Sequence, residues 1–424
     1  MSPPNLYSNP DRQTLDFADD ISDDGLYYSS SSSRMTKHTH PLIHFVRNEW
    51  QTNPKYSHLS PASDRTEAPR WVQIVGSIVT APRFRRYAVV YFGLLLSCWI
   101  GWHFVLSPRL EEQTALLKSL DPHEKGWVGW FGSNSLPELT DVIQLGSLDP
   151  KLLPAAKTPQ AGEPNHRRLV VVGDVHGCKM ELERLLEEVS FDKDHDHLIF
   201  TGDLINKGPD SPGVVDLARK YSASCVRGNH EDRVLLLRHE MDPSNPLTNN
   251  SRIETDPLLN QNRKERELAR RLTDEQAKWL DACPIILNVG QITGMGQVVV
   301  VHAGLIPGVD LEKQDPYSVM NMRTIDLDTH VPSASHDGMK WSKLFNKHQS
   351  LLSSTLKDGA SDAGSGVMMT VLYGHDAKNS LSLKTYTKGL DSGCVKGGKL
   401  TALVIQDGGQ QNIVQVQCSD HNKK

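Results

Sequence analysis

Five apolar runs between residues 168 and 375 have the pattern of buried strands, and each ends in a polar segment. β-Branched residues are frequent in these runs, which are LVVV before GDVHG, HLIFT before GDLINKGPDS, SCV before RGNHE, QVVVV before HAG and VMMTVLY before GHDA. Short apolar runs bounded by turn residues are typical of strands. We therefore predict a central sheet that presents polar side chains at its strand ends, on loops held by a rigid scaffold.

Helical patterns follow two of these polar segments. The apolar residues between Cys178 and Val189 fall largely on one helical face, and they are Met180, Leu182, Leu185, Leu186 and Val189. Ser211 and Pro212 are predicted to be the N-cap and first position of a second helix. We also expect a charged helical insertion over residues 232–282 and a flexible loop over residues 350–366.

A third apolar pattern, Tyr87 to Leu106, contains twenty residues without a formal charge. At about 1.5 Å per residue, a helix of this length crosses the roughly 30 Å hydrocarbon core of a lipid bilayer. A buried core helix is the alternative, but such helices usually keep a polar face. Arg83, Arg85 and Arg86 precede the run and Arg109 follows it, so the positive-inside rule puts the N-terminus in the cytosol.

These patterns divide the chain into four parts. Residues 1–82 are rich in Ser, Asp and Pro, and we expect a disordered cytosolic tail. Residues 83–107 form the transmembrane anchor with its basic flank. Residues 108–166 are predicted to be a luminal stalk with a short helix near Leu110–Leu120. Its aromatic residues (Trp127, Trp130 and Phe131) are expected to dock on the catalytic domain, with the membrane surface as the alternative. Residues 167–418 form the catalytic domain.

Composition excludes some alternatives. The net charge of −5 gives no indication of nucleic-acid binding. Six cysteines form no CxxC pair, which argues against a zinc finger or a redox motif. Cys225 and Cys283 have apolar neighbours and are interpreted as buried thiols, although a disulfide of unknown pairing is possible. A glycosylation sequon at Asn249 fits an extracytosolic domain.

The polar segments contain the residue types that a pair of divalent metals needs. Asp203 is the natural bridging ligand, Asp174 and His176 would complete one metal, and Asn229, His302 and His375 would complete the other. Mixed oxygen and imidazole ligands suit zinc, manganese, cobalt or iron. Two such metals can clamp the attacking and leaving oxygens when a phosphate ester or anhydride is hydrolysed.

Each motif by itself has a simpler structural explanation. A lone histidine is more often a hydrogen-bonded core residue than a metal ligand, but several motifs in one chain outweigh this alternative. The histidines outside the motifs are interpreted as having no role in the site, and they are His195, His197, His239, His330, His336 and His348. Asp210 and Glu231 are expected to cap helices or support the ligands.

The motif order resembles the calcineurin-like metallophosphoesterase superfamily, in its phosphoprotein-phosphatase branch. Within that branch, GDLINKGPDS, TDEQAKWLDACPI and DSGCVKGGKLTAL resemble the ApaH-like group, and the added anchor makes the chain similar to endopolyphosphatases of the fungal vacuole. The resemblance implies an α/β sandwich, in which two sheets are flanked by helices. It also implies two divalent metals on the six ligands named above and attack by a metal-bridging hydroxide.

The resemblance also suggests roles for the residues next to the ligands. His230 would protonate the leaving oxygen as general acid, while Arg227, Lys207 and Asn229 would hold the phosphoryl oxygens. This sequence departs from the family pattern in two places: Asn206 replaces an aspartate that orients the acid histidine, and Lys207 replaces an arginine. A neutral amide stabilises an imidazolium less than a carboxylate does.

These features favour a phosphohydrolase that cuts inorganic polyphosphate internally in an acidic lumen, with Lys396 and Lys399 extending the positive charge. An anhydride leaving group needs less protonation than a serine alkoxide, which suits Asn206. A dinucleoside polyphosphate hydrolase and a serine/threonine protein phosphatase are the enzyme alternatives. A membrane-tethered binding protein with a degenerate site is the non-enzyme alternative.

Overall fold

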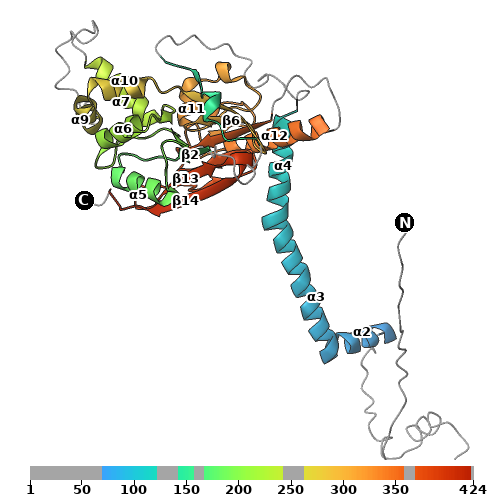
Figure 1. The fold of residues 1–424 in the computed structure, drawn as a ribbon. Coiled ribbons are helices and arrows are strands. Elements are labelled where there is room, and N and C mark those ends of the chain that lie inside the picture. The colour runs from blue at the N-terminus through green and yellow to red at the C-terminus, as the bar shows by residue number, and fades with distance from the viewer. Residues whose placement is uncertain (1–68, 122–141, 157–166, 242–261, 358–367, 422–424) are drawn as a thin grey trace, which may run out of the picture. The chain divides into compact units, whose positions relative to one another are not determined.

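The computed structural model describes residues 69–121, 142–156, 167–241, 262–357 and 368–421. The chain forms two compact units, Met1–Phe92 and Gly93–Lys424. The described part of the first unit consists of α2 (Arg70–Thr80) and the beginning of α3 (Pro82–Gly101) (Figure 1). Residues Arg70–Thr80, which were predicted to belong to the disordered tail, form α2.

A continuous helical segment, Pro82–Ser119, contains the apolar run predicted to span a membrane. It comprises α3, five residues in π-helical geometry (η1, Trp102–Leu106) and α4 (Ser107–Ser119). The most apolar part of this segment is not buried against other described residues. Its length and composition thus make it a candidate membrane span, and α4 confirms the helix predicted near Leu110–Leu120.

In the second unit, one sheet contains five strands in the order β14-β13-β2-β3-β4. The strands are β2 (Arg168–Val172), β3 (Asp196–Phe200), β4 (Ser224–Cys225), β13 (Lys399–Ile405) and β14 (Gln411–Gln417). β2, β3 and β4 are parallel, whereas β13 runs antiparallel to both β2 and β14. The three parallel strands therefore end at the same edge of the sheet.

A second sheet contains six strands in the order β1-β5-β6-β10-β12-β11. The strands are β1 (Leu145–Ser147), β5 (Ile286–Ile292), β6 (Gly296–Val301), β10 (Met369–Tyr373), β11 (Ser382–Leu383) and β12 (Thr387–Gly389). β6 and β10 are parallel, so their ends also meet at one edge. A small sheet in the order β8-β7-β9 consists of β7 (Thr324–Ile325), β8 (Pro332–Ser333) and β9 (Met339–Lys340).

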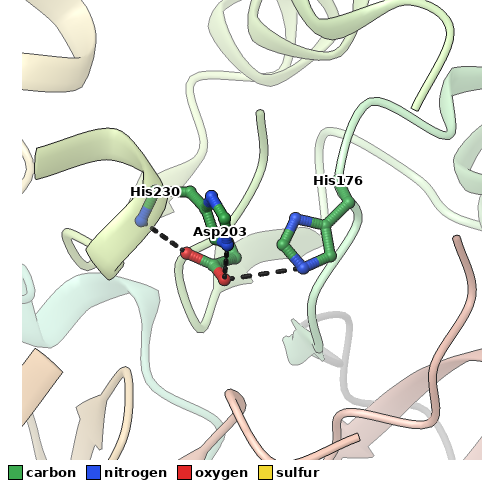
Figure 2. A group of neighbouring side chains, drawn as sticks. All are labelled: His176, Asp203 and His230. Carbon is green, nitrogen blue, oxygen red and sulfur yellow. Dashed lines mark hydrogen bonds and ion pairs between the residues drawn. The ribbon is translucent and has the colours of Figure 1, made fainter. Parts of the chain in front are cut away.

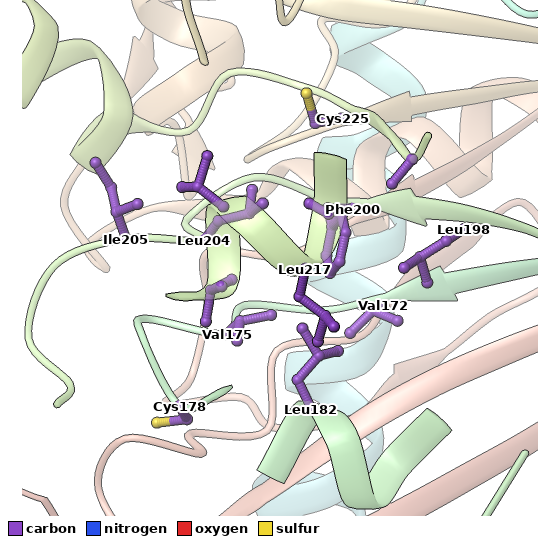
Figure 3. Close-up of a cluster of buried hydrophobic side chains, with 14 of the residues drawn as sticks. Val172, Val175, Cys178, Leu182, Leu198, Phe200, Leu204, Ile205, Leu217 and Cys225 are labelled. Carbon is purple, nitrogen blue, oxygen red and sulfur yellow. The ribbon is translucent and has the colours of Figure 1, made fainter. Parts of the chain in front are cut away.

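Alternating side chains explain why the two sheets pack face to face. In β2, Leu169 and Val171 lie in a core shared with Val298 and Val300 of β6. The intervening residues of β2, such as Val172, point to the opposite core, beneath helices (Figure 3). A strand that is apolar on both faces is typical of a sheet covered on both sides, and this burial is the main stabilising contribution.

Helices cover the outer faces of both sheets. On the five-stranded sheet these are α5 (Lys179–Val189), α6 (Ser211–Lys220), α7 (Asn229–Glu240), α9 (Arg263–Arg271) and α10 (Asp274–Asp281). On the six-stranded sheet, α4, α11 (Pro316–Asn321) and α12 (Trp341–Lys357) contribute. Short 3-10 segments are η3 (Pro150–Leu152), η5 (Leu311–Lys313) and η6 (Asp407–Gly409). The predicted α/β sandwich with flanking helices is confirmed.

Several local predictions need correction. Met180 is 74% exposed rather than buried, because it lies on the solvent side of α5. The N-cap of α6 is Asp210, whose side chain accepts a hydrogen bond from the backbone N–H of Gly213, and Ser211 is already helical. The first part of the predicted flexible loop, up to Lys357, belongs to α12, and residues 358–367 lie outside the described residues.

The predicted stalk is partly folded into the second unit. β1 pairs in parallel with β5, and Leu116 and Leu120 are buried in the core beneath α12. The strand β1 has few apolar residues, so its pairing is decided by the neighbouring strand rather than by its own pattern. Trp127, Trp130, Phe131 and Asn249 lie outside the described residues.

Two disulfides form in the second unit, Cys225–Cys283 and Cys394–Cys418. Cys225 and Cys283 are therefore not the free thiols that their apolar neighbours indicated, since the fold brings the end of β4 beside the segment after α10. Of the described cysteines, Cys178 is buried and free, and Cys98 lies exposed in α3.

Candidate metal centre

The carboxyl ends of five strands carry the candidate site. The segments after β2, β3 and β4 come from one sheet, and those after β6 and β10 come from the other. Ligand sites of α/β proteins typically lie at such strand ends. The structure brings together all six residues predicted to bind metal, Asp174, His176, Asp203, Asn229, His302 and His375.

Asp203 belongs to both halves of this arrangement, and Figure 2 shows it between His176 and His230. Its Oδ2 atom is 3.5 Å from Nε2 of His176, and its Oδ1 atom is 3.4 Å from Nε2 of His302. Asp203 is the residue shared by two groups that could each hold a metal ion, one with His176 and His230 and one with His302 and His375. A carboxylate whose two oxygens face different imidazoles has the arrangement that a bridging ligand requires.

On one side of Asp203, several acceptor atoms converge. His302 directs Nδ1 to the carbonyl oxygen of Thr201 at 2.8 Å, and His375 directs Nε2 to the carbonyl of Asn321 at 3.1 Å. In these contacts the ring N–H groups point to backbone carbonyls, away from Asp203, and the other ring nitrogens face the site. The inward atoms, Nε2 of His302 and Nδ1 of His375, are then 3.1 Å apart, and Oδ1 of Asn229 is 3.0 Å from Nε2 of His302.

Such a convergence of lone pairs favours a positive charge at their meeting point. Burial disfavours the protonated form of His302, but the nearby carboxylate of Asp203 outweighs burial and raises the pKa of His302. Burial lowers the pKa of His375 to about 2, and His302 adds to this effect. Either a proton on His302 or a metal ion supplies the charge, and the ligand set fits a divalent metal.

On the other side of Asp203, His176 provides the inward nitrogen. Its Nδ1 atom is 3.3 Å from the carbonyl of Ile205, and its Nε2 atom is 4.0 Å from Oδ2 of Asp174. Burial lowers the pKa of His176 to about 3, although Asp203 acts in the opposite direction. The ring is therefore neutral with a free lone pair, which the ammonium group of Lys207 approaches at 3.0 Å.

Buried carboxyl groups add to the need for a cation on this side. Burial, reinforced by Asp391 and Asp203, raises the pKa of Asp174 well above its ordinary value. Burial also raises the pKa of Asp391, which hydrogen-bonds to Asp174. Backbone N–H of His375 donates to Asp174 at 3.1 Å. Divalent cations would keep these carboxylates ionised, so the residues present fit a pair of metals.

His230 is positioned by Asn206. The Oδ1 atom of Asn206 accepts the backbone N–H of Lys207 at 2.8 Å, so its amide nitrogen faces Nδ1 of His230, also at 2.8 Å. This orientation leaves the proton of the neutral imidazole on Nε2, which lies 3.9 Å from Oδ2 of Asp203. The pKa of His230 is lowered, mainly by burial. Asn206 thus directs the ring without stabilising its charged form.

Arg227, which was predicted to contact phosphoryl oxygens, is not among the described residues that line the metal cleft. Its side chain is 4% exposed, and its guanidinium group pairs with Asp281 at 2.7 Å and with Asp232 at 3.5 Å. It also donates to the backbone carbonyl of Asp281 at 2.8 Å. Arg227 therefore ties the start of α7 to the end of α10, and Lys207 is the cation nearest to the ligands.

Glu231 and Asp210 have the supporting roles predicted for them. The carboxylate of Glu231 accepts backbone N–H groups from Asp203 at 2.7 Å, Gly228 at 3.0 Å and Ile205 at 3.1 Å. It therefore fixes the loop that carries the bridging ligand to the loop that carries Asn229. The side chain of Asp210 caps α6.

The backbone at the site adopts conformations that are unfavourable for most residues. Nine described residues other than glycine have positive φ, and five of them belong to the site, namely His176, Asp203, Asn206, Lys207 and His375. Two glycines permit close approach, since a Cβ at Gly374 would lie 2.0 Å from Oδ1 of Asp174 and one at Gly228 would lie 2.3 Å from Oδ1 of Asp203. Strain of this kind is concentrated at functional sites.

A cleft of about 170 Å³ opens onto the metal ligands. Several of its lining residues were not predicted to belong to the site, namely Arg323, His336, Lys378 and Asp391, whereas Lys396 was predicted to add positive charge. Lys399, by contrast, is not part of the described lining. His336 and Arg323 belong to no motif, and only the DSGC segment indicated Asp391. The cleft is thus lined by more cations than the motifs alone indicate.

Comparisons with known proteins agree with this geometry. The sequence profile of the calcineurin-like phosphoesterase family matches residues 167–379. The chain is 30% identical to a zinc-dependent endopolyphosphatase of Saccharomyces cerevisiae over 283 residues, which cover 60% of this chain and 82% of that protein. It is 34% identical over 143 residues to a symmetrical bis(5'-nucleosyl)-tetraphosphatase of Pectobacterium carotovorum, covering 33% of this chain and 44% of that one.

Among solved structures, a putative diadenosine tetraphosphatase is 28% identical, with a TM-score of 0.47 over 65% of this chain and 99% of that one. The family assignment rests on the sequence matches and on the strand-end ligands, not on this superposition. The chain belongs to the calcineurin-like phosphoesterase family and is a metal-dependent phosphohydrolase.

Proposed function

We propose that this protein is a membrane-anchored endopolyphosphatase, which cleaves inorganic polyphosphate within the chain. The observation that carries the proposal is the positive lining of the metal cleft, where Lys207, Arg323, Lys378 and Lys396 face the site with His230. A linear polyanion suits such a lining better than a neutral peptide segment does. The similarity to a zinc-dependent endopolyphosphatase supports the same substrate.

Each part of the site has a role in this reaction. Two divalent ions held by the six ligands supply electrostatic stabilisation of the attacking and leaving oxygens. Lys207 and Asn229 bind nonbridging oxygens of the phosphoryl group that is attacked. The neutral ring of His230 donates a hydrogen bond from Nε2–H to the leaving oxygen, and Asn206 keeps the ring in that orientation.

Asn206 also favours an anhydride as substrate. An aspartate at this position would stabilise the imidazolium form of His230, which a serine leaving group requires. A phosphate leaving group is a much weaker base and needs little proton transfer. The chemistry of the site thus matches cleavage between two phosphates.

Zinc is the proposed metal, because the ligand set accepts it and the yeast relative is zinc-dependent. Manganese, cobalt and iron satisfy the same ligands and serve as comparison metals. Activity should be measured after chelation and re-addition of each ion, with metal content determined on the same samples.

A dinucleoside polyphosphate hydrolase is the second candidate. It is favoured by the 34% identity to a bacterial bis(5'-nucleosyl)-tetraphosphatase. That match covers less than half of the bacterial protein. A match that covers 96% of a tetraphosphatase of Nitrosospira multiformis is 26% identical, whereas the endopolyphosphatase match is 30% identical and covers 82% of its relative. We therefore place polyphosphate first and the dinucleotide second.

We further propose that Tyr87–Leu106 crosses a lipid bilayer, with residues 1–82 in the cytosol and the catalytic domain in the lumen of the vacuole or another endomembrane compartment. Two disulfides in the second unit support this location, because disulfides persist in oxidising compartments and are rare in the cytosol. The arginines before the span agree with the same orientation.

Gel analysis of long-chain polyphosphate tests the substrate. The purified protein with zinc should shorten long chains to intermediate lengths before free phosphate accumulates. Parallel assays contain diadenosine tetraphosphate and a phosphoserine peptide. Faster hydrolysis of either of these, or release of single phosphates without intermediates, would contradict the proposal.

Protease protection tests the topology. Protease added to intact vesicles that contain the protein should remove an epitope placed before Arg83 and spare one placed after Leu106. Detergent should then expose both epitopes. Protection of the first epitope with loss of the second would show the opposite orientation.

A further inference from the structure

A second cleft of about 140 Å³ adjoins the metal cleft. The two clefts share Arg323 and Asp376, so these two side chains border both of them. The remaining lining of the second cleft includes Lys340, at the end of β9, and Lys384, between β11 and β12. Positive charge therefore continues beyond the metal ligands.

The three cations in this region lack acidic partners. Arg323, Lys340 and Lys384 form no ion pair with a carboxylate in the described part of the chain, whereas nearby Lys343 pairs with Glu112. Lys340 donates to the side chain of Asn379, and Lys384 donates to the hydroxyl of Ser342 at 2.9 Å. Neutral acceptors thus hold both ammonium groups in place without neutralising them.

Burial disfavours the charged forms of these side chains because it removes water that would stabilise them. The pKa of Lys384 is lowered by burial and, to a smaller extent, by Lys340 and Lys343, while the carboxylate of Glu112 acts weakly in the opposite direction. The guanidinium of Arg323 donates to the carbonyl of Ala334 at 3.0 Å, but its Nε atom is buried and has no hydrogen-bond partner. An anion in this cleft would offset the repulsion between these cations.

Asp376 is the single carboxylate that lines the second cleft among the described residues. One of its oxygens accepts a hydrogen bond from the side chain of Asn379, and the other is buried without a partner. Three cations against one carboxylate leave the cleft positive. The balance therefore favours an anionic ligand rather than a metal ion.

We propose that Arg323, Lys340 and Lys384 form a subsite for the phosphates of a polyphosphate chain that lie beyond the bond being cut. This inference rests on the proposed polyphosphate substrate. Arg323 lines both clefts, so a chain held at the metals passes Arg323 before it reaches the two lysines. Short substrates end before the lysines and gain nothing from them, so the subsite selects long chains.

The test compares the double variant Lys340→Ala/Lys384→Ala with the full-length wild type, using long-chain polyphosphate and tripolyphosphate. We expect KM for the long chain to rise about tenfold with little change in kcat, because binding is lost far from the reacting atoms. KM for tripolyphosphate should stay the same. Equal effects on both substrates, or no effect on the long chain, would overturn the proposal.

Two further variants separate charge from packing. Lys340→Gln/Lys384→Gln keeps polar side chains that can hydrogen-bond but removes the charge, and it should reproduce the rise in KM. Lys347→Ala removes a lysine of α12 that lines neither cleft, and it should leave both substrates unaffected. A charge-neutral pair that behaves like the wild type would show that the lysines do not act electrostatically.

A competition assay distinguishes failure of the subsite from failure of the proposed function. The wild type hydrolyses p-nitrophenyl phosphate in the presence of long-chain polyphosphate. If the protein does not cut polyphosphate, the proposed function fails. The subsite still predicts that polyphosphate inhibits competitively, with an inhibition constant about tenfold weaker in the double variant. Unchanged inhibition would reject the subsite alone.

Discussion

The metal centre and the positively charged lining around it are built in different ways. The metal ligands lie directly after strands of the two sheets, so hydrogen-bonded strands set their positions. Most lining cations, such as Arg323 and Lys396, come from short strands and irregular segments. The centre is therefore fixed by the core of the fold, whereas the lining can change with little effect on it. We therefore expect the metal centre to determine the reaction and the charged lining to determine the choice of substrate.

Loss of the bridging ligand should have the largest effect. Asp203→Asn removes the charge shared between the two halves of the centre and should lower kcat by about 10³-fold or more. Metal content, measured by mass spectrometry, should fall, while the circular dichroism spectrum stays unchanged. Asp194→Asn, at an exposed turn, is the control. Near-normal turnover of Asp203→Asn would show that the centre is not dinuclear.

Lys207 and Arg227 provide the next contrast, because only one of them faces the cleft. Lys207→Ala should lower kcat/KM about 10²-fold with little change in stability. Arg227→Ala breaks two ion pairs of a buried guanidinium and should lower the free energy of unfolding by about 3 kcal/mol. The folded Arg227 variant should keep most of its activity. If Arg227→Ala instead abolished activity without loss of stability, a substrate contact would be established.

The Cys394–Cys418 disulfide joins the lining to β14. Gly393, Val395 and Lys396 line the cleft on either side of Cys394. Replacing both cysteines by serine should lower the free energy of unfolding by about 3 kcal/mol, as expected for a closed loop of this length. KM for polyphosphate should rise as well. Removing Cys225–Cys283 should also destabilise the protein but change KM less. Denaturant unfolding measures the first effect and steady-state kinetics the second.

Asn206→Asp should alter substrate preference by a smaller amount. A carboxylate beside Nδ1 of His230 stabilises the imidazolium, so hydrolysis of a phosphoserine peptide should increase about fivefold relative to polyphosphate. The ratio of the two kcat/KM values measures the effect and cancels differences in active fraction. An unchanged ratio would mean that leaving-group protonation does not distinguish these substrates.

Replacement of Glu181 should have the smallest effect, which is on stability. Its carboxylate binds the C-terminal segment that follows β14. Burial raises its pKa, but hydrogen bonds from backbone N–H groups and from His421 outweigh burial and leave the pKa below its ordinary 4.5. A depressed pKa means that the stabilisation is present above the unfolded-state pKa and is lost as pH falls through the folded-state value.

Glu181→Gln should therefore lower the free energy of unfolding by about 1 kcal/mol at neutral pH. The difference from the wild type should shrink as pH falls below 4.5 and disappear below the folded-state pKa, as urea unfolding at several pH values can measure. Glu183→Gln, an exposed glutamate on the same helix, is the control. A difference that persists in acid would assign the loss to packing instead of charge.

The two regions also differ in how far the sequence predicted them. The ligands were predictable because each follows an apolar strand within a few residues, so local patterns carry the information. Arg323, His336 and Lys378 were not, because their places depend on long-range packing of segments without a motif. Arg227 was assigned to substrate binding from the family resemblance, and its ion pairs with Asp232 and Asp281 were not predictable from the local sequence. The disulfides depend on the same long-range packing.

The left-handed backbone of Asn206 and Lys207 limits how far mutation can raise the thermal stability of this enzyme without loss of activity. Each such residue costs about 1–3 kcal/mol that glycine would not. A selection for thermal resistance would therefore favour glycine at both positions, and the surviving proteins would have lost the amide that orients His230 and the ammonium that faces His176. Stabilising changes should be sought elsewhere, because at this loop tolerance to heat and turnover oppose each other.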